Sequence, residues 1–170
     1  MRITKPLALF FMLSLAVVGL AGAAGIGTFT IEQTKSADVG QIGIATLYVD
    51  NTWQPLADDV WVKVSWDGAV LGYVSADWKV GTSRDAQLTD NELFIKVADW
   101  TNKFENGKIA IVDLYFQGKT QGSSPMTITV DHVRSHEGTS TAIAADLTQS
   151  AVATPGTFTV AAGNGGVVPT

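Results

Sequence analysis

The stretch Val60–Val74, VWVKVSWDGAVLGYV, decides how the chain folds. Its first half alternates between two sets of residues, which are Val60, Val62, Val64 and Trp66 on one side and Trp61, Lys63, Ser65 and Asp67 on the other. Side chains of a strand alternate between its two faces, so the first set can line a core while the second faces outward. Asp67-Gly68 then supplies turn chemistry, because glycine accepts a positive φ without a Cβ clash. The stretch predicts a strand, a tight turn and a second core-facing segment.

Similar short segments recur along the chain, separated by turn signals. The expected strands are Thr28–Gln33, Val39–Asp50, Glu92–Ala98, Lys108–Gln117, Met126–Val133 and Thr157–Val160, and Trp78–Asp90 is expected to be a loop with a short strand. No stretch beyond the N-terminal region is a convincing amphipathic helix. About eight or nine short strands at regular spacing predict an all-β protein, either a two-sheet antiparallel β-sandwich or a barrel.

The N-terminal segment is typical of a secretory signal peptide. Arg2 and Lys5 precede an uncharged apolar run, Leu7–Leu20, which ends in the small residues Ala21-Gly22-Ala23. The alternative is a membrane anchor that is never cut, but the run is short for a span of roughly 20 apolar residues. We therefore predict a signal peptide over residues 1–23, one domain over residues 24–160 and a flexible Gly-rich tail over residues 161–170. The protein is expected to be secreted, with no membrane span after cleavage.

Composition excludes several classes of function. Without the segment 1–23, nine basic and 16 acidic residues remain, so the net charge is −7. Nucleic-acid affinity rests on Lys and Arg that neutralise phosphates, so we expect no nucleic-acid partner. The chain has no cysteine, which excludes disulfides, thiol catalysis and cysteine-ligated metals.

No catalytic or metal-binding pattern stands out. His132 and His136 lie four positions apart on an expected strand, which separates them by roughly 13 Å, and a zinc site needs a third ligand. Asp58 and Asp59 are adjacent, so on a strand they face opposite ways, and the pair is best interpreted as a solvated turn. We expect no enzyme activity, no metal and no cofactor.

The central stretch resembles that of cohesin domains, which carry an alternating strand, a Tyr-Asp-Pro turn and a Val-Leu-x-Tyr/Phe segment. Here the matching residues run from Val62 to Val74, with Trp66 in place of the tyrosine and Gly68 in place of the proline. The later cohesin strands are matched by Gly107–Phe116, Ser124–Thr129 and the closing TFTV of Thr157–Val160.

This resemblance implies a jelly-roll β-sandwich that holds a dockerin-bearing partner on one sheet face. Carried over to this sequence, it places Asp59, Trp61 and Lys63 on the outer face of the strand that contacts dockerin. It places Lys96 and Asp99 on the neighbouring strand. These five residues are the expected partner-binding residues.

Lys108–Gln117 departs from simple alternation. The resemblance places Ala110, Val112, Leu114 and Phe116 inward, yet the opposite parity holds the apolar residues Ile109, Ile111 and Tyr115. A half-exposed antiparallel strand normally alternates apolar with polar residues. We therefore expect Ile109, Ile111 and Tyr115 to form an assembly face, covered by another part of the chain or by a second copy.

Tryptophans leave a third option open. An outward Trp61 is a plausible contact for sugar or protein unless a loop covers it. Trp53, Trp78 and Trp100 lie near expected loops, where they can plug the ends of the sandwich or line a saccharide platform. The sequence thus predicts a non-catalytic extracellular docking module. The alternatives are a self-assembling subunit of a cell-surface layer, sheath or fibre, and a polysaccharide-binding module.

Overall fold

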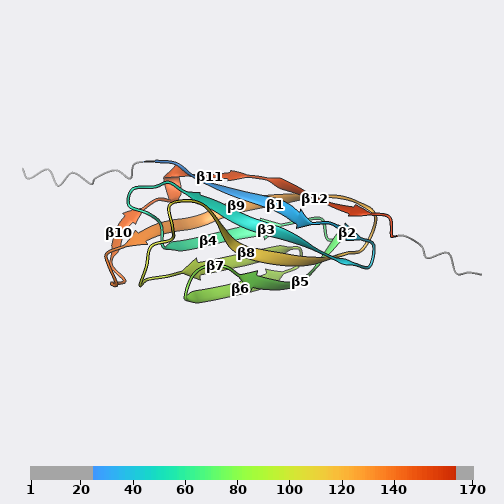
Figure 1. Ribbon diagram of the computed structural model, residues 1–170, viewed down its shortest axis with the longest axis horizontal. Coiled ribbons are helices and arrows are strands. Elements are labelled where there is room, and N and C mark those ends of the chain that lie inside the picture. Colours follow the sequence, from blue (N-terminus) through green and yellow to red (C-terminus); the bar gives the residue numbers. More distant parts are fainter. Residues whose placement is uncertain (1–24, 164–170) are drawn as a thin grey trace, which may run out of the picture.

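The computed structural model describes residues 25–163, which form two stacked β-sheets (Figure 1). The strands are β1 Gly27–Lys35, β2 Ala37–Asp38, β3 Ile42–Asn51, β4 Asp59–Ser65, β5 Leu71–Trp78, β6 Ser83–Thr89, β7 Glu92–Ala98, β8 Gly107–Gly118, β9 Gly122–His136, β10 Ile143–Asp146, β11 Ala151–Thr154 and β12 Gly156–Ala161. A 3-10 turn, η1 Thr148–Ser150, precedes β11. The expected signal peptide and residues 164–170 of the expected tail lie outside the described residues.

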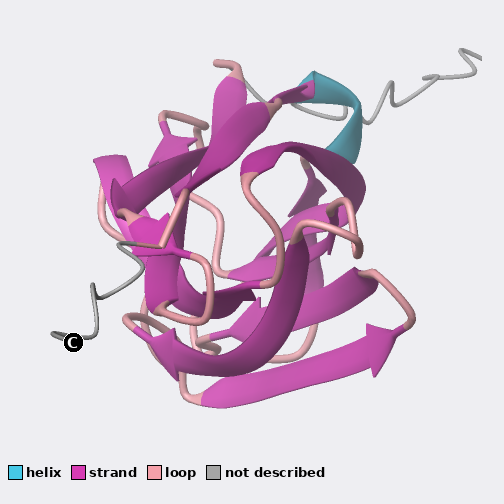
Figure 2. Ribbon diagram, turned by 90° about the vertical axis from the view of Figure 1, so that its right-hand side faces the viewer, coloured by secondary structure: helices cyan, strands magenta, loops and turns pink. Residues whose placement is uncertain are grey.

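The smaller sheet has the strand order β11-β1-β3-β8-β5, and the larger sheet has the order β2-β12-β9-β4-β7-β6, with β10 beside β9. Figure 2 shows how the sheets curl around the interior. The predicted two-sheet β-sandwich is confirmed. Most strand pairs are antiparallel, and two short pairings, β1 with β11 and β2 with β12, are parallel. Within residues 25–163, no helix is long and apolar enough to cross a membrane.

Strand β4 occupies the predicted central position. It pairs with β9 on one side and β7 on the other. Val60, Val62 and Val64 are fully buried, and Trp66 is 7% exposed. Trp66 packs edge-on against Phe116 of the opposite sheet, with ring centroids 5.0 Å apart. The alternation in the sequence therefore placed the core correctly along this strand.

The turn after β4 forms where the sequence predicted it, for a different reason. Asp67 caps the turn, because its Oδ1 accepts a hydrogen bond from the Ala69 amide at 2.8 Å and its carbonyl accepts one from Val70 at 3.1 Å. Gly68 does not have a positive φ. Instead, a Cβ there would lie 2.0 Å from Oδ1 of Asn91, so a larger residue would require the Asn91 side chain to move.

A β-bulge in β8 overturns the expected assembly face. Leu47 pairs with Val112 and Tyr48 pairs with Ala110, so Ile111 is an extra residue and the side-chain alternation shifts by one. Ile111 is fully buried, and Ile109 packs against the core. Ala110, expected inward, lies opposite the outward Tyr48. The prediction that Ile109 and Ile111 face outward is wrong, and of the expected face only Tyr115 lies outside, half-buried.

A second bulge, in β9, reorients the end of that strand. Trp61 pairs with His132 and Val62 with Val130, so Asp131 is the extra residue. Before the bulge Met126 and Ile128 point into the core, and after it Val133 does so. His132 is consequently on the outer side of the larger sheet, beside Trp61. Simple alternation along Met126–Val133 would have sent His132 inward.

Trp53 plugs one end of the sandwich, which is one of the two roles that the sequence left open for the tryptophans near loops. It is fully buried and packs against Phe29 with ring centroids 6.2 Å apart. Its indole N–H donates to Oγ of Ser150 at 2.8 Å. Trp53 is therefore closed to any ligand, whereas Trp100 remains 43% exposed.

Candidate functional site

Four outward side chains of the larger sheet form a continuous surface, which we call the aromatic face. They are Trp61 on β4, Phe94 and Lys96 on β7, and His132 on β9. In the strand register Trp61 lies opposite His132 on one side and Lys96 on the other. Lys96 in turn lies opposite Asp85 on β6. The sheet thus lines up an imidazole, an indole, an ammonium and a carboxylate across four strands.

Trp61 is the centre of this surface. Its ring stacks on His132, with centroids 4.0 Å apart and planes at 34°, and meets the edge of Phe94 at 6.0 Å. Nζ of Lys96 lies 4.9 Å from the centre of the Trp61 ring, within the range of a cation–π contact. These neighbours hold the indole in place, while Trp61 itself stays half-exposed. A half-exposed, immobilised tryptophan is the residue type that dominates protein-binding surfaces.

The two lysines predicted on this face both lie over aromatic rings. Nζ of Lys63 is 5.6 Å from the centre of the Phe94 ring and 3.8 Å from the Glu92 carboxylate. Nζ of Lys96 is 4.7 Å from the same ring and 3.9 Å from Asp85. Such exposed ion pairs contribute at most about 1 kcal/mol, so both ammonium groups can exchange their partners for those of a bound protein.

Asp59 lies under the aromatic face rather than on it. The residue is 6% exposed, and its Oδ2 is 3.3 Å from Nε2 of His132. Burial lowers the pKa of His132, and the adjacent Asp59 only partly offsets this. The neutral imidazole therefore donates to the carboxylate. Asp59 is predicted to lie on the outer face as a partner-binding residue, and the structure buries it beneath its neighbours there, with its Oδ1 lacking a hydrogen-bond partner.

Asp99 is separated from the other predicted residues. It follows β7, and its Oδ1 accepts from the Thr101 hydroxyl at 2.6 Å and from the Thr101 and Asn102 amides. The Thr101 hydroxyl is the main reason why the pKa of Asp99 is lowered. The carboxylate therefore shapes its own loop. The structure brings Trp61, Lys63 and Lys96 together, and leaves Asp99 outside this group.

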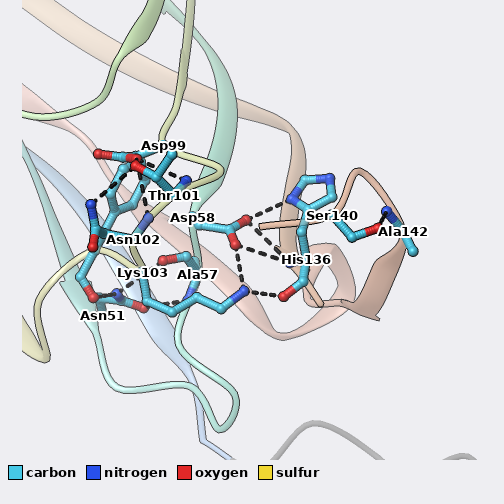
Figure 3. Close-up of polar contacts among 11 residues, drawn as sticks. Asn51, Ala57, Asp58, Asp99, Thr101, Asn102, Lys103, His136, Ser140 and Ala142 are labelled. Carbon is cyan, nitrogen blue, oxygen red and sulfur yellow. Dashed lines mark hydrogen bonds and ion pairs between the residues drawn. The ribbon is translucent and has the colours of Figure 1, made fainter. Parts of the chain in front are cut away.

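Asp58 and His136 form a second buried pair at the end of the larger sheet (Figure 3). Asp58 is 1% exposed, and its carboxylate accepts from His136 Nδ1 at 2.7 Å and from Nζ of Lys103 at 2.5 Å. The same ammonium also reaches the His136 carbonyl. The interpretation of Asp58-Asp59 as a solvated turn is wrong, because each acid is buried against a histidine of β9. In the described part of the chain, no three acidic or histidine residues are placed to hold a metal.

A groove of about 950 Å³ is lined by β3 and β8 together with residues 79–81, Arg84 of β6 and the loop residues 99 and 103–105. Its polar groups are bonded to one another: the Thr46 hydroxyl donates to Asp113 Oδ1 at 2.5 Å, and Lys79 pairs with Asp113 at 2.9 Å. Nζ of Lys108 lies 4.4 Å from the centre of the Tyr48 ring and covers the aromatic surface there. This groove therefore offers few free groups to a ligand.

Comparisons with known proteins agree on the architecture. No family model matches the sequence, and no curated protein matches it either. Among solved structures, the seventh ScaB type I cohesin from Pseudobacteroides cellulosolvens superposes with a TM-score of 0.68 at 14% identity, over 81% of this chain and 93% of that one. The chain has the cohesin fold.

Two further cohesins show how widely this fold is shared. The sixth cohesin from scaffoldin B of Acetivibrio cellulolyticus, solved in complex with a dockerin, has a TM-score of 0.64 at 14% identity, over 80% of this chain and 99% of that one. A non-cellulosomal cohesin from Archaeoglobus fulgidus has a TM-score of 0.60 at 14% identity, over 82% and 94%. The cohesin-like strand patterns of the sequence are thereby confirmed at the level of the fold.

Sequence reasoning missed two residues of the aromatic face. The sequence predicts Phe94 only as part of a strand, although Phe94 has the same parity as Lys96. It points to His132 only as a possible metal ligand, because alternation alone gives no signal of the bulge at Asp131. Only the pairing of β9 with β4 shows that the imidazole covers Trp61.

Proposed function

We propose that this chain is a non-catalytic extracellular docking module that binds a dockerin-like protein through the aromatic face. The observation that carries the proposal is the half-exposed Trp61, held by His132, Phe94 and Lys96 on the outer face of β4. The cohesin fold supports it, since one of the matching cohesins was solved with a dockerin bound. The expected signal peptide supports an extracellular setting.

Physical properties of the face fit protein recognition better than catalysis. Binding energy at protein interfaces concentrates in a few central Trp, Tyr and Arg residues, surrounded by groups that exclude water. Trp61 is central, and Lys63, Lys96 and Glu92 form a charged rim around the aromatic rings. A rim of this kind sets orientation and association rate, while the aromatic centre supplies affinity.

The self-assembling subunit and the polysaccharide-binding module have weaker support. The former rested on an apolar outer face at Ile109 and Ile111, and both residues contribute to the core. The latter needs several exposed tryptophans on one open platform, but Trp53 and Trp66 are buried, and Trp61 and Trp100 line a hollow of only about 230 Å³. No observation on the described residues favours either function over docking.

The test is a titration of the mature chain with dockerin modules from the secretome of its own organism, by isothermal calorimetry. A 1:1 complex is expected, and Trp61→Ala should weaken it at least thirtyfold, which corresponds to about 2 kcal/mol. Tyr115→Ala is the matched control, because Tyr115 is a half-buried aromatic residue on the outer face of the other sheet. The proposal fails if no dockerin binds, or if Trp61→Ala binds as tightly as Tyr115→Ala.

A further inference from the structure

A hollow of about 230 Å³ adjoins the aromatic face on the side of β7 and β6. Its lining includes Trp61 and Asp59 of β4, Lys96 of β7, Asp85 of β6 and Trp100 of the following loop. The volume equals about eight water molecules at roughly 30 Å³ each. It is below the range of about 300–1,000 Å³ typical of small-molecule sites. This space matches the size of one long side chain of a bound protein.

The carboxylate at this hollow is incompletely paired. Asp59 is only 6% exposed, and its Oδ2 interacts with His132 on β9. Strand β9 flanks β4 on the side away from β7 and the hollow. The other oxygen of Asp59, Oδ1, has no hydrogen-bond partner. A buried carboxylate oxygen without a donor loses its hydration with nothing in exchange, so the site favours a ligand that brings a donor.

Charge also favours a cation at this place. His132 is neutral near pH 7 because burial lowers its pKa, so it does not neutralise Asp59. Lys96 is the one ammonium among the residues that line the hollow, and its ion pair is with Asp85, at 3.9 Å, rather than with Asp59. Among the lining residues two carboxylates share one ammonium, and Arg134, which lies opposite Asp59 on β9, is not part of the lining.

The aromatic walls select a planar cation. Trp61 already accepts the Lys96 ammonium 4.9 Å from its ring centre, which shows that cations are stable over this indole. Trp100, in the loop after β7, also lines the hollow and is 43% exposed. A guanidinium group can stack on an indole and donate in the same plane to a carboxylate, whereas an ammonium cannot do both.

We infer that this hollow is an arginine-specific subsite of the docking face, in which a partner's guanidinium stacks on the exposed indole of Trp100, beside Trp61, and donates to Asp59. The inference rests on the proposed docking function and adds the chemistry of the partner: an exposed arginine on its binding surface. The guanidinium supplies the donor that the Asp59 carboxylate lacks, and Lys96 keeps its pairing with Asp85.

The experiment requires no partner protein. The mature protein, labelled with ¹⁵N, is titrated with N-acetyl-arginine methylamide. Parallel titrations use its uncharged isostere N-acetyl-citrulline methylamide and N-acetyl-lysine methylamide. The indole N–H signals of Trp61 and Trp100, assigned from single Trp→Phe variants, are followed. We expect saturable shifts of both signals with the arginine compound, and at least tenfold weaker apparent affinity for the other two.

Two variants make the test specific. Asp59→Asn keeps the shape of the side chain and removes its charge, so it should weaken the arginine response at least tenfold. Asp38→Asn, in β2 at the other end of the larger sheet, should leave it unchanged. If Asp59→Asn does not fold, Trp100→Ala at the exposed wall serves in its place, with the same expected loss.

Several results would overturn the inference. They are equal responses to arginine and citrulline compounds, no response of the two indoles, or an undiminished response in Asp59→Asn or Trp100→Ala. A protein that binds dockerin through Trp61 but ignores the arginine compound would retain the docking function and lose only this subsite. Conversely, an arginine response in a chain that binds no dockerin would retain the subsite chemistry and remove its proposed partner.

Discussion

Nδ1 of His136 lies 2.7 Å from Oδ1 of Asp58, although 78 residues separate the two in the chain. The Asp58 carboxylate also accepts from the His136 amide and from Lys103, so three donors from two separate segments converge on one buried acid. The contact joins the start of β4, the loop after β7 and the end of β9. This cluster holds the three segments together at one end of the larger sheet, whose outer side carries the aromatic face.

Loss of Lys103 should therefore destabilise the protein. Lys103→Met leaves the Asp58 carboxylate buried without its cation, and breaking a buried pair costs about 3–5 kcal/mol. Because the Lys103 side chain is 29% exposed, we expect the lower end of this range, measured by urea denaturation. Lys108→Met is the control, since its ion pair with Glu32 is exposed and should contribute less than about 1 kcal/mol. Equal losses in the two variants would contradict this role of the buried cluster.

Truncation should destabilise the protein much more at Ile111 than at Tyr115. Ile111→Ala removes fully buried atoms at the β8 bulge and should cost about 2–5 kcal/mol of unfolding free energy. Tyr115→Ala acts on the outer face and should cost less than about 1 kcal/mol. Both are measured by urea denaturation with one shared m-value. A neutral Ile111→Ala would restore the assembly face that the sequence suggested.

Stability should fall as pH drops through the range in which histidine titrates. Burial lowers the pKa of His132 in the folded state, so the unfolded chain binds more protons between that value and about 6.5. Protonation therefore favours unfolding, and stability present above about pH 6.5 is lost below it. The charged groups facing His132 are Asp59, Asp131 and Arg134, and Trp61 stacks on its ring.

Thermal unfolding between pH 7.5 and 5 should report this group. We expect wild type to lose up to about 1.4 kcal/mol per pH unit more than His132→Gln. The variant keeps a neutral donor to Asp59 and removes the titration. Parallel pH profiles of the two proteins would show that His132 does not carry the effect.

Thr46 should control the ionisation of Asp113. Burial raises the pKa of Asp113, but hydrogen bonds from the Thr46 hydroxyl and from Lys79 outweigh this and leave it below its ordinary value. Thr46→Val keeps the β-branched shape and removes one donor, so the pKa should rise, as measured by NMR titration of the carboxyl carbon. Lys79→Met should raise it as well, whereas Lys108→Met should not. An unchanged pKa in Thr46→Val would exclude the hydroxyl as a cause.

The sequence alone was enough for the central strand and for the class of fold. Val60, Val62 and Val64 are buried as the alternation required, and the strand over Glu92–Ala98 has the predicted bounds. Trp61, Lys63 and Lys96 share the predicted outer face. These features depend on local periodicity and turn chemistry, both of which are determined by residues adjacent in the sequence.

Tertiary structure alone decided which polar groups meet and where the alternation breaks. The bulges at Ile111 and Asp131 shift the facing of every residue beyond them, and a bulge depends on the pairing strand rather than on local composition. Asp58 and Asp59 are adjacent in sequence, yet each is buried against a histidine from a strand more than 70 residues later. A carboxylate is stable inside a protein only when a partner arrives to compensate its lost hydration, and which partner arrives is set by long-range strand pairing, not by neighbours in the sequence.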